Sequence, residues 1–144
     1  MATDRTANVV WQGDLMNGSG TIAQVPSGAF GPLDVSWASR AEEPGGKTSP
    51  EELIAAAWAS CFAMALSNGL AKDGNAPEKL ETSATVTFQP GEGIIRGALT
   101  VRGTVPGLDQ AGFAEAAETA KQNCPVSKAL SGIPDVSLDA QLAS

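Results

Sequence analysis

One long apolar stretch in the middle of the chain constrains the fold more than any other part of the sequence. From Ser49 to Ser67 the residues are mostly alanine and large apolar types, which predicts a helix. Ser49 suits the N-cap, Pro50 suits the first turn because its missing amide donor would have no partner there, and Glu52 completes a capping box. Because little polar face is left, we expect protein to cover both sides of this helix, in a core or between subunits.

The size and charge of the chain limit its class. The chain has 144 residues, of which 42% are hydrophobic, so it can bury one sizeable core. This predicts a single domain over residues 1–144. Nine basic residues against 16 acidic ones give a net charge of -7, which disfavours nucleic acid and anionic membranes as partners. Residues 1–8 lack the apolar segment of a signal peptide, and we expect no apolar run long enough to span a bilayer, so we predict a cytoplasmic protein.

The sequence contains no histidine and no tyrosine. The usual general base, the usual zinc ligand and any Ser-His or Cys-His arrangement are therefore excluded. The two cysteines are the best candidates for chemistry, and two thiols without histidine make a weak metal site, so we expect neither a metal nor a cofactor. In a reducing cytosol such thiols are more often free or catalytic than permanently bridged.

Short segments on both sides of the long helix alternate with turns. Before it we predict three strands, at residues 7–12, 20–25 and 33–40, with Val35, Trp37 and Ser39 on one face of the third. After it, which ends at residues 72–77, we predict strands 81–88 and 94–105 around a hairpin turn, a helix from Asp109 to about Asn123, a short helix 125–130 and a strand 136–142. This order indicates an α+β fold with antiparallel sheets packed around the central apolar helix.

The two cysteines have different surroundings. Cys61 lies inside the apolar helix, so we expect it to be largely buried, and a role in core packing is as reasonable as catalysis. Cys124 precedes Pro125, which places it near the start of a short helix, where unpaired amides favour a thiolate. The simpler interpretation of Cys124 is a residue that only flanks this helix.

A buried thiol needs a nearby cation to react at neutral pH, and Arg40 is the best-placed candidate. Arg40 precedes the loop 41–48 that leads into the long helix, so it can fold back over that helix. Glu51 precedes Cys61 by ten residues, about 15 Å along a helix axis, so it is too far away to act on the thiol but can hold a guanidinium in a bidentate ion pair. The simpler interpretation is that Glu51 and Glu52 complement the helix dipole.

Three segments together resemble a known family. They are Pro50–Ala57 (PEELIAAA), Cys61–Ser67 (CFAMALS) and Cys124–Leu130 (CPVSKAL). They are similar to the OsmC/Ohr family, in particular to its OsmC branch, and the similarity extends over essentially the whole chain, from Val10 to Leu142. The resemblance implies an OsmC-like fold in an intertwined homodimer whose active sites lie at the subunit interface.

The resemblance also implies an activity and a role for each candidate residue. It implies a thiol-dependent peroxidase that reduces organic hydroperoxides and, more weakly, hydrogen peroxide. Cys61 resembles the peroxidatic cysteine and Cys124 the resolving cysteine, which together form an intramolecular disulfide that a dithiol such as dihydrolipoamide reduces. Arg40 resembles the arginine that stabilises the thiolate and the leaving alkoxide, and Glu51 resembles its anchor, a role that Glu52 takes if the helix begins differently.

Two other functions stay open at this point. One is a catalytically silent dimer that binds an apolar ligand in its interfacial groove. The other is a thiol redox sensor that uses the same cysteine pair to signal through a partner, although the chain has no basic face for DNA. Consumption of many equivalents of peroxide per subunit separates the peroxidase from both.

Overall fold

The computed structural model describes residues 1–143 and contains two compact units. Unit 1 is Met1–Leu53 and unit 2 is Ile54–Ser144. The long helix α2 (Pro50–Lys72) contributes its first residues to unit 1 and the remainder to unit 2. The elements follow one another as βββ-αα-ββ-αα-β, an α+β arrangement as predicted.

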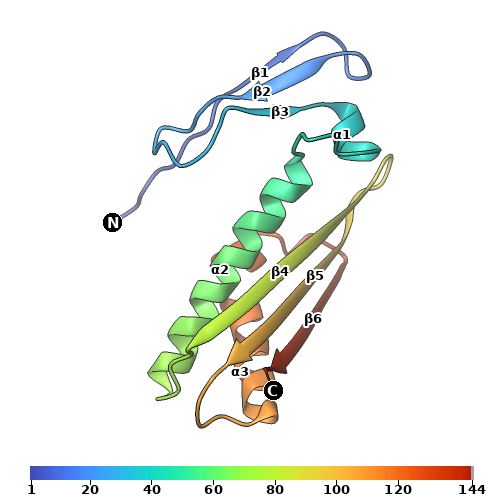
Figure 1. Cartoon of the computed structure of the whole chain (residues 1–144). Coiled ribbons are helices and arrows are strands. Elements are labelled where there is room, and N and C mark those ends of the chain that lie inside the picture. Colours follow the sequence, from blue (N-terminus) through green and yellow to red (C-terminus); the bar gives the residue numbers. More distant parts are fainter. Residues whose placement is uncertain (144) are drawn as a thin grey trace. The chain divides into compact units, whose positions relative to one another are not determined.

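Unit 1 contains a small antiparallel sheet and a short helix. The strands β1 (Val9–Gln12), β2 (Ser19–Ile22) and β3 (Leu33–Val35) lie in this order in the sheet, and α1 (Trp37–Ala41) follows. The predicted turn between the first two strands is present, since the carboxylate of Asp14 accepts a hydrogen bond of 2.8 Å from the amide of Asn17. Figure 1 shows the three strands side by side in the blue part of the chain.

The prediction of a strand from 33 to 40 is wrong beyond Val35, because the chain turns into α1. Ser36 caps this helix: its hydroxyl accepts from the amide of Ser39 at 3.1 Å, and the hydroxyl of Ser39 accepts from the amide of Ser36 at 3.0 Å. This reciprocal pair stabilises a helix start more than the alternating apolar pattern stabilises a strand. Trp37 and Ser39 therefore do not share a strand face with Val35, and Arg40 lies in the last turn of a helix.

The start of α2 agrees with the predicted cap in part. The hydroxyl of Ser49 accepts from the amide of Glu52 at 3.2 Å, as an N-cap does. The carboxylate of Glu52 differs from the predicted capping box. It accepts a hydrogen bond of 2.8 Å from the hydroxyl of Thr48, which lies outside the helix.

Within unit 2, α2 has one buried ridge. Its buried side chains recur every four residues, at Trp58, Phe62, Leu66 and Leu70, and all of them are at most 2% exposed. Met64, on another side of the helix, is 72% exposed. The part of the chain described here therefore covers one side of this helix well and leaves another open.

Unit 2 contains the larger sheet. Its strands β4 (Lys79–Gln89), β5 (Gly93–Thr104) and β6 (Asp135–Leu142) lie in sequence order, and β4 and β5 form the predicted antiparallel hairpin. The expectation of a wholly antiparallel sheet is wrong for β6, which runs parallel to β5. The helices α3 (Gln110–Asn123) and α4 (Pro125–Ala129) form the crossover between these two strands, and such a crossover returns the chain in its original direction.

Two glycines of β5 make room for aromatic rings of the helices. A Cβ atom at Gly97 would lie 2.5 Å from the ring of Trp58 on α2, and one at Gly103 would lie 2.5 Å from the ring of Phe113 on α3. Positions 97 and 103 are on the same face of β5, because side chains alternate along a strand. Both helices therefore pack on this one face, where they enclose the apolar core of unit 2.

The length of α2 corrects one further expectation. By length and composition α2 could cross a membrane, with 23 residues and a hydropathy of 1.5 in its most apolar window, so the expectation that no apolar run has that length is wrong. The core helix of a soluble protein passes the same test. In α2, 22% of that window is buried within the described part of the chain, at the ridge from Trp58 to Leu70.

Candidate functional site

The two cysteines lie in direct contact in unit 2. Cys61 is on α2, and Cys124 is the single residue between α3 and α4. Their Sγ atoms are 3.0 Å apart and are joined by a hydrogen bond, and neither is in a disulfide. Cys124 is completely buried, and Cys61 is partly buried and packs against the same core, in line with the expectation that it is largely buried. Position 61 lies at the edge of the buried ridge of α2, so Cys61 is less buried than Cys124.

The surroundings of the pair affect its two thiols in opposite directions. Burial raises the pKa of Cys61, and the hydrogen bond with Cys124 raises it further, more than the amide of Val126 lowers it. Burial also acts to raise the pKa of Cys124, but the hydrogen bonds from Cys61, from the amide and hydroxyl of Ser127 and from the amide of Val126 outweigh it, so this pKa is lowered. A negative charge on the pair is therefore held better by Cys124 than by Cys61.

Two hydrogen bonds fix α2 beside the thiol pair. The indole Nε1 of Trp58 donates to the hydroxyl of Ser127 on α4 at 2.7 Å, and the hydroxyl of Thr82 on β4 donates to the carbonyl of Ala59 at 3.2 Å. Neither Trp58 nor Ser127 is among the residues that the sequence predicts for the site. The signal that could have found this contact is general: a buried tryptophan needs an acceptor for its N–H.

The predicted partners Arg40 and Glu51 meet in unit 1. The guanidinium Nε of Arg40 is 3.0 Å from Oε1 of Glu51, and Nη2 is 2.9 Å from Oε2, so the ion pair is bidentate. The side chain of Glu51 is 8% exposed and that of Arg40 is 32% exposed. Glu52 contacts Thr48 instead, so Glu51 is the carboxylate that holds this arginine.

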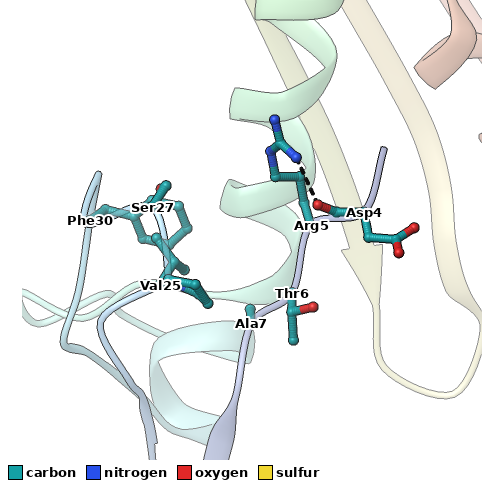
Figure 2. Close-up of a pocket in the computed structure, with 8 residues that line it drawn as sticks. Asp4, Arg5, Thr6, Ala7, Val25, Ser27 and Phe30 are labelled. Carbon is teal, nitrogen blue, oxygen red and sulfur yellow. Dashed lines mark hydrogen bonds between the residues drawn. The ribbon is translucent and has the colours of Figure 1, made fainter. Parts of the chain in front are cut away.

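Unit 1 also contains a cavity of about 660 Å³ near the N-terminus. Figure 2 shows Arg5, Thr6 and Ala7 on one of its walls and Val25 and Phe30 on another. The guanidinium of Arg5 donates to the backbone carbonyl of Asp4 at 2.7 Å. None of the four candidate site residues lines this cavity. Within residues 1–143, no group of three or more His, Cys, Asp or Glu side chains could hold a metal ion.

The sequence matches the family model described as "OsmC-like protein" over residues 43–139, which is more than half of the chain. The chain belongs to the OsmC-like protein family. It is 37% identical to the peroxiredoxin OsmC of Escherichia coli strain K12 over 147 residues, which cover 100% of both chains. It is also 36% identical to the organic hydroperoxide resistance protein of Xanthomonas axonopodis pv. citri over 98 residues, which cover 65% of this chain and 67% of that one. The predicted resemblance to the OsmC/Ohr family is thereby confirmed.

Solved structures of OsmC-like proteins agree with the α+β fold described above. The organic hydroperoxide resistance protein OhrB of Bacillus subtilis superposes with a TM-score of 0.65 and 26% identity, over 96% of this chain and 98% of that one. The predicted OsmC-like fold is therefore confirmed. Of the four candidate residues, Cys61 and Cys124 meet in unit 2 and Arg40 and Glu51 meet in unit 1, and their functional roles stay predictions.

Proposed function

We propose that this OsmC-like protein is a thiol-dependent peroxidase that reduces organic hydroperoxides to alcohols and, more weakly, reduces hydrogen peroxide. The main support is the contact of 3.0 Å between the sulfurs of Cys61 and Cys124. Two thiols at this distance can form a disulfide after one of them is oxidised, because a disulfide bond is only about 1 Å shorter. The names of the relatives, a peroxiredoxin and an organic hydroperoxide resistance protein, support the same class of substrate.

In the first step, the thiolate of Cys61 attacks an oxygen of the hydroperoxide. A sulfur–oxygen bond forms, the O–O bond breaks, and the leaving alkoxide takes a proton to become the alcohol, so that Cys61 becomes a sulfenic acid. The thiolate of Cys124 then attacks the sulfur of Cys61. A disulfide forms, and the hydroxyl group leaves with a proton as water. An external dithiol of the dihydrolipoamide type returns both thiols by two exchange reactions.

Arg40 and Glu51 have supporting roles in this proposal. The raised pKa of Cys61 means that the thiol needs a nearby cation to ionise at neutral pH. In unit 2 the pKa of Cys61 is affected by burial, by Cys124 and by a backbone amide, and none of these three is a cation. We assign this role to Arg40, which Glu51 holds in a fixed orientation by two parallel hydrogen bonds. The guanidinium would also stabilise the alkoxide as it leaves.

We further propose that the protein works as a homodimer in a reducing compartment such as the cytoplasm. Large apolar side chains are exposed on both units: Val9, Val10 and Trp11 of β1 and Met64 of α2 are 40 to 72% exposed. A second copy of the chain is the partner that the family resemblance implies. Sedimentation analysis should give twice the mass of one chain, and a monomer at micromolar concentration would contradict this part of the proposal.

The decisive experiment measures peroxide loss over many turnovers. Reduced protein is mixed with excess cumene hydroperoxide and dihydrolipoamide. We expect continued consumption by the wild type, none by Cys61→Ser, and loss of the intramolecular disulfide in Cys124→Ser. Ser60→Ala is the matched control, since its hydroxyl bonds only to the helix carbonyls of Ala56 and Ala57.

The same measurement distinguishes the two other functions. Consumption that stops after a single equivalent per subunit, with every dithiol tried, indicates a redox sensor. No consumption at all, together with binding of an apolar probe, indicates the catalytically silent binding protein.

A further inference from the structure

The two sulfurs of the thiol pair are also a preformed pair of soft ligands. The Sγ atoms of Cys61 and Cys124 lie 3.0 Å apart, and both residues are free thiols. They belong to separate parts of unit 2, since Cys61 is inside α2 and Cys124 joins α3 to α4. The fold therefore already holds the sulfurs together, and a ligand that bonds to both does not have to bring them into contact.

The distance between the sulfurs discriminates among ligands that prefer thiols. A zinc–sulfur bond is about 2.3 Å long, so a tetrahedral zinc ion holds two sulfurs about 3.8 Å apart, and a linear ion with bonds of that length holds them about 4.6 Å apart. Trivalent arsenic is pyramidal, and two bonds of that length that meet near a right angle hold the sulfurs about 3.3 Å apart. The observed contact of 3.0 Å is closest to the pyramidal geometry.

The number of available ligands also favours arsenic over a metal ion. A structural zinc site takes four protein ligands. Within residues 1–143, no group of three or more His, Cys, Asp or Glu side chains could hold a metal ion. A monosubstituted trivalent arsenical brings its own organic group as one of its three substituents, so two thiols complete its coordination.

The surroundings of the pair suit an uncharged product. Cys124 is 0% exposed in the apolar core of unit 2, and Cys61 packs against that core. The buried polar side chains of the described residues belong to unit 1, so the core around the sulfurs is apolar. An arsenical bonded to two sulfurs carries no net charge, and its burial therefore avoids the cost of burying an ion.

We propose that Cys61 and Cys124 form a chelating site for monosubstituted trivalent arsenicals. Phenylarsine oxide, which carries two hydroxyl groups on its arsenic in water, is the probe for this class. Cys61 reacts first because it is the more accessible thiol, and Cys124 then closes the ring.

The reaction is a substitution without electron transfer. Two sulfur–arsenic bonds form and two arsenic–oxygen bonds break, and each hydroxyl group leaves with the hydrogen of one thiol as water. Arsenic stays trivalent, so no oxidant or reductant takes part. The inference needs only the contact between the two thiols and does not rest on the proposed peroxidase cycle.

The test adds phenylarsine oxide to the reduced full-length protein and measures the intact mass of the product. We expect one arsenical per subunit, and the mass should show that both arsenic hydroxyls have left as water. Tryptophan fluorescence gives the affinity, because Trp58 lies three residues before Cys61 on α2. An excess of dimercaptopropanol should reverse the binding, whereas the same concentration of a monothiol should not.

Single substitutions show whether both sulfurs bind. Cys124→Ser leaves one accessible thiol, and the affinity should fall at least about 100-fold because the second bond is no longer intramolecular. Cys61→Ser leaves only the completely buried thiol and should bind no more tightly than Cys124→Ser. Ser60→Ala is the matched control and should bind like the wild type, since this hydroxyl donates only to the carbonyls of Ala56 and Ala57.

An adduct that keeps a hydroxyl on arsenic would overturn the inference, and so would single-cysteine variants that bind as tightly as the wild type. Should either variant fail to fold, the mass of the wild-type adduct still decides, because it counts the hydroxyls that are lost. Zn²⁺ that displaces the arsenical at equal concentration would also contradict the predicted selectivity.

The outcome is separate from that of the peroxidase experiment. Chelation by a protein that consumes no peroxide would reject the peroxidase and keep the arsenical site. Peroxide turnover by a protein that does not chelate the arsenical would reject the site alone.

Discussion

The two units of this chain hold their reactive groups in opposite ways. Unit 2 holds the two sulfurs among apolar side chains, and Phe62, Leu66 and Phe113 of its core are completely buried. The buried polar side chains of the described residues, Ser39 and Glu51, both belong to unit 1. Unit 1 holds them by hydrogen bonds and an ion pair.

The two environments are suited to different tasks. An apolar environment brings two thiols into contact and excludes water, but it also raises the pKa of Cys61 and so opposes its ionisation. A polar environment can keep a guanidinium in one orientation through a carboxylate. The proposed chemistry needs both, and four substitution experiments can test whether the two units differ as described.

The largest effect is expected in the core of unit 2. Phe113→Ala removes a ring that is 0% exposed and should lower the free energy of unfolding by about 3 to 5 kcal/mol. Phe30→Ala in unit 1 is the matched control, because this ring is 44% exposed and should lower it by less than about 1 kcal/mol. Urea unfolding measures both, and equal losses would show that the apolar core is not confined to unit 2.

A smaller effect is expected where β5 meets α2. Gly97→Ala places a methyl group against the ring of Trp58 and should lower the free energy of unfolding by about 1 to 3 kcal/mol. Gly69→Ala on α2 has open space around it, and it should raise that free energy by about 0.5 to 1 kcal/mol because alanine favours the helix. A stabilising Gly97→Ala would mean that the ring can move away without loss.

The ion pair of unit 1 should affect both stability and turnover. Glu51→Gln weakens the hold on Arg40, which is a third exposed, and should lower the free energy of unfolding by about 1 to 2 kcal/mol. Peroxide turnover should fall at least about tenfold, because the barrier rises by a similar energy. Glu52→Gln is the matched control and should keep nearly full turnover; an equal loss in both variants would contradict the role of Glu51.

The smallest effects are expected in the pH dependence of stability, and they have opposite signs for the two thiols. The lowered pKa of Cys124 adds stability that is present above the ordinary thiol value of 9.0 and is lost as the pH falls through the folded value. The raised pKa of Cys61 adds stability that is present below 9.0 and is lost as the pH rises through the folded value.

These signs can be measured with single-cysteine variants. Relative to Cys124→Ser, the wild type should gain stability as the pH rises toward 9.0, because the hydrogen bond from Cys61 that lowers the pKa of Cys124 is present. Relative to the variant without cysteines, Cys124→Ser should lose stability as the pH rises above 9.0, because burial still raises the pKa of Cys61. Denaturant unfolding at several pH values gives both slopes. A wild type that loses stability relative to Cys124→Ser as the pH rises toward 9.0 would contradict the lowered pKa of Cys124.

The features that the sequence predicts well are local ones. The caps and composition of α2 are sufficient to predict it, and the turn residues between 89 and 93 are sufficient to predict the hairpin of β4 and β5. The helix α1 was not predicted because it depends on how the side chains of Ser36 and Ser39 meet. A short alternating segment fits a strand equally well until those two bonds are known.

The features that the sequence did not predict depend on long-range packing. The direction of β6 follows from a crossover through two helices. The side of α2 that faces the core could not be predicted either, because α2 is apolar on nearly every side. The bond from Trp58 to Ser127 joins residues 69 positions apart, and no periodic pattern indicates such a pair.

The contact between the two sulfurs also limits damage from the substrate. In the proposed cycle, the sulfenic acid on Cys61 forms with its nucleophile already 3.0 Å away, so it survives only briefly. A second peroxide molecule has to arrive within that short lifetime to oxidise it to the sulfinic acid, which is irreversible for most proteins. Under excess oxidant the protein should therefore accumulate in its disulfide form. A dithiol can then restore it after exposure to peroxide levels that inactivate an isolated thiol.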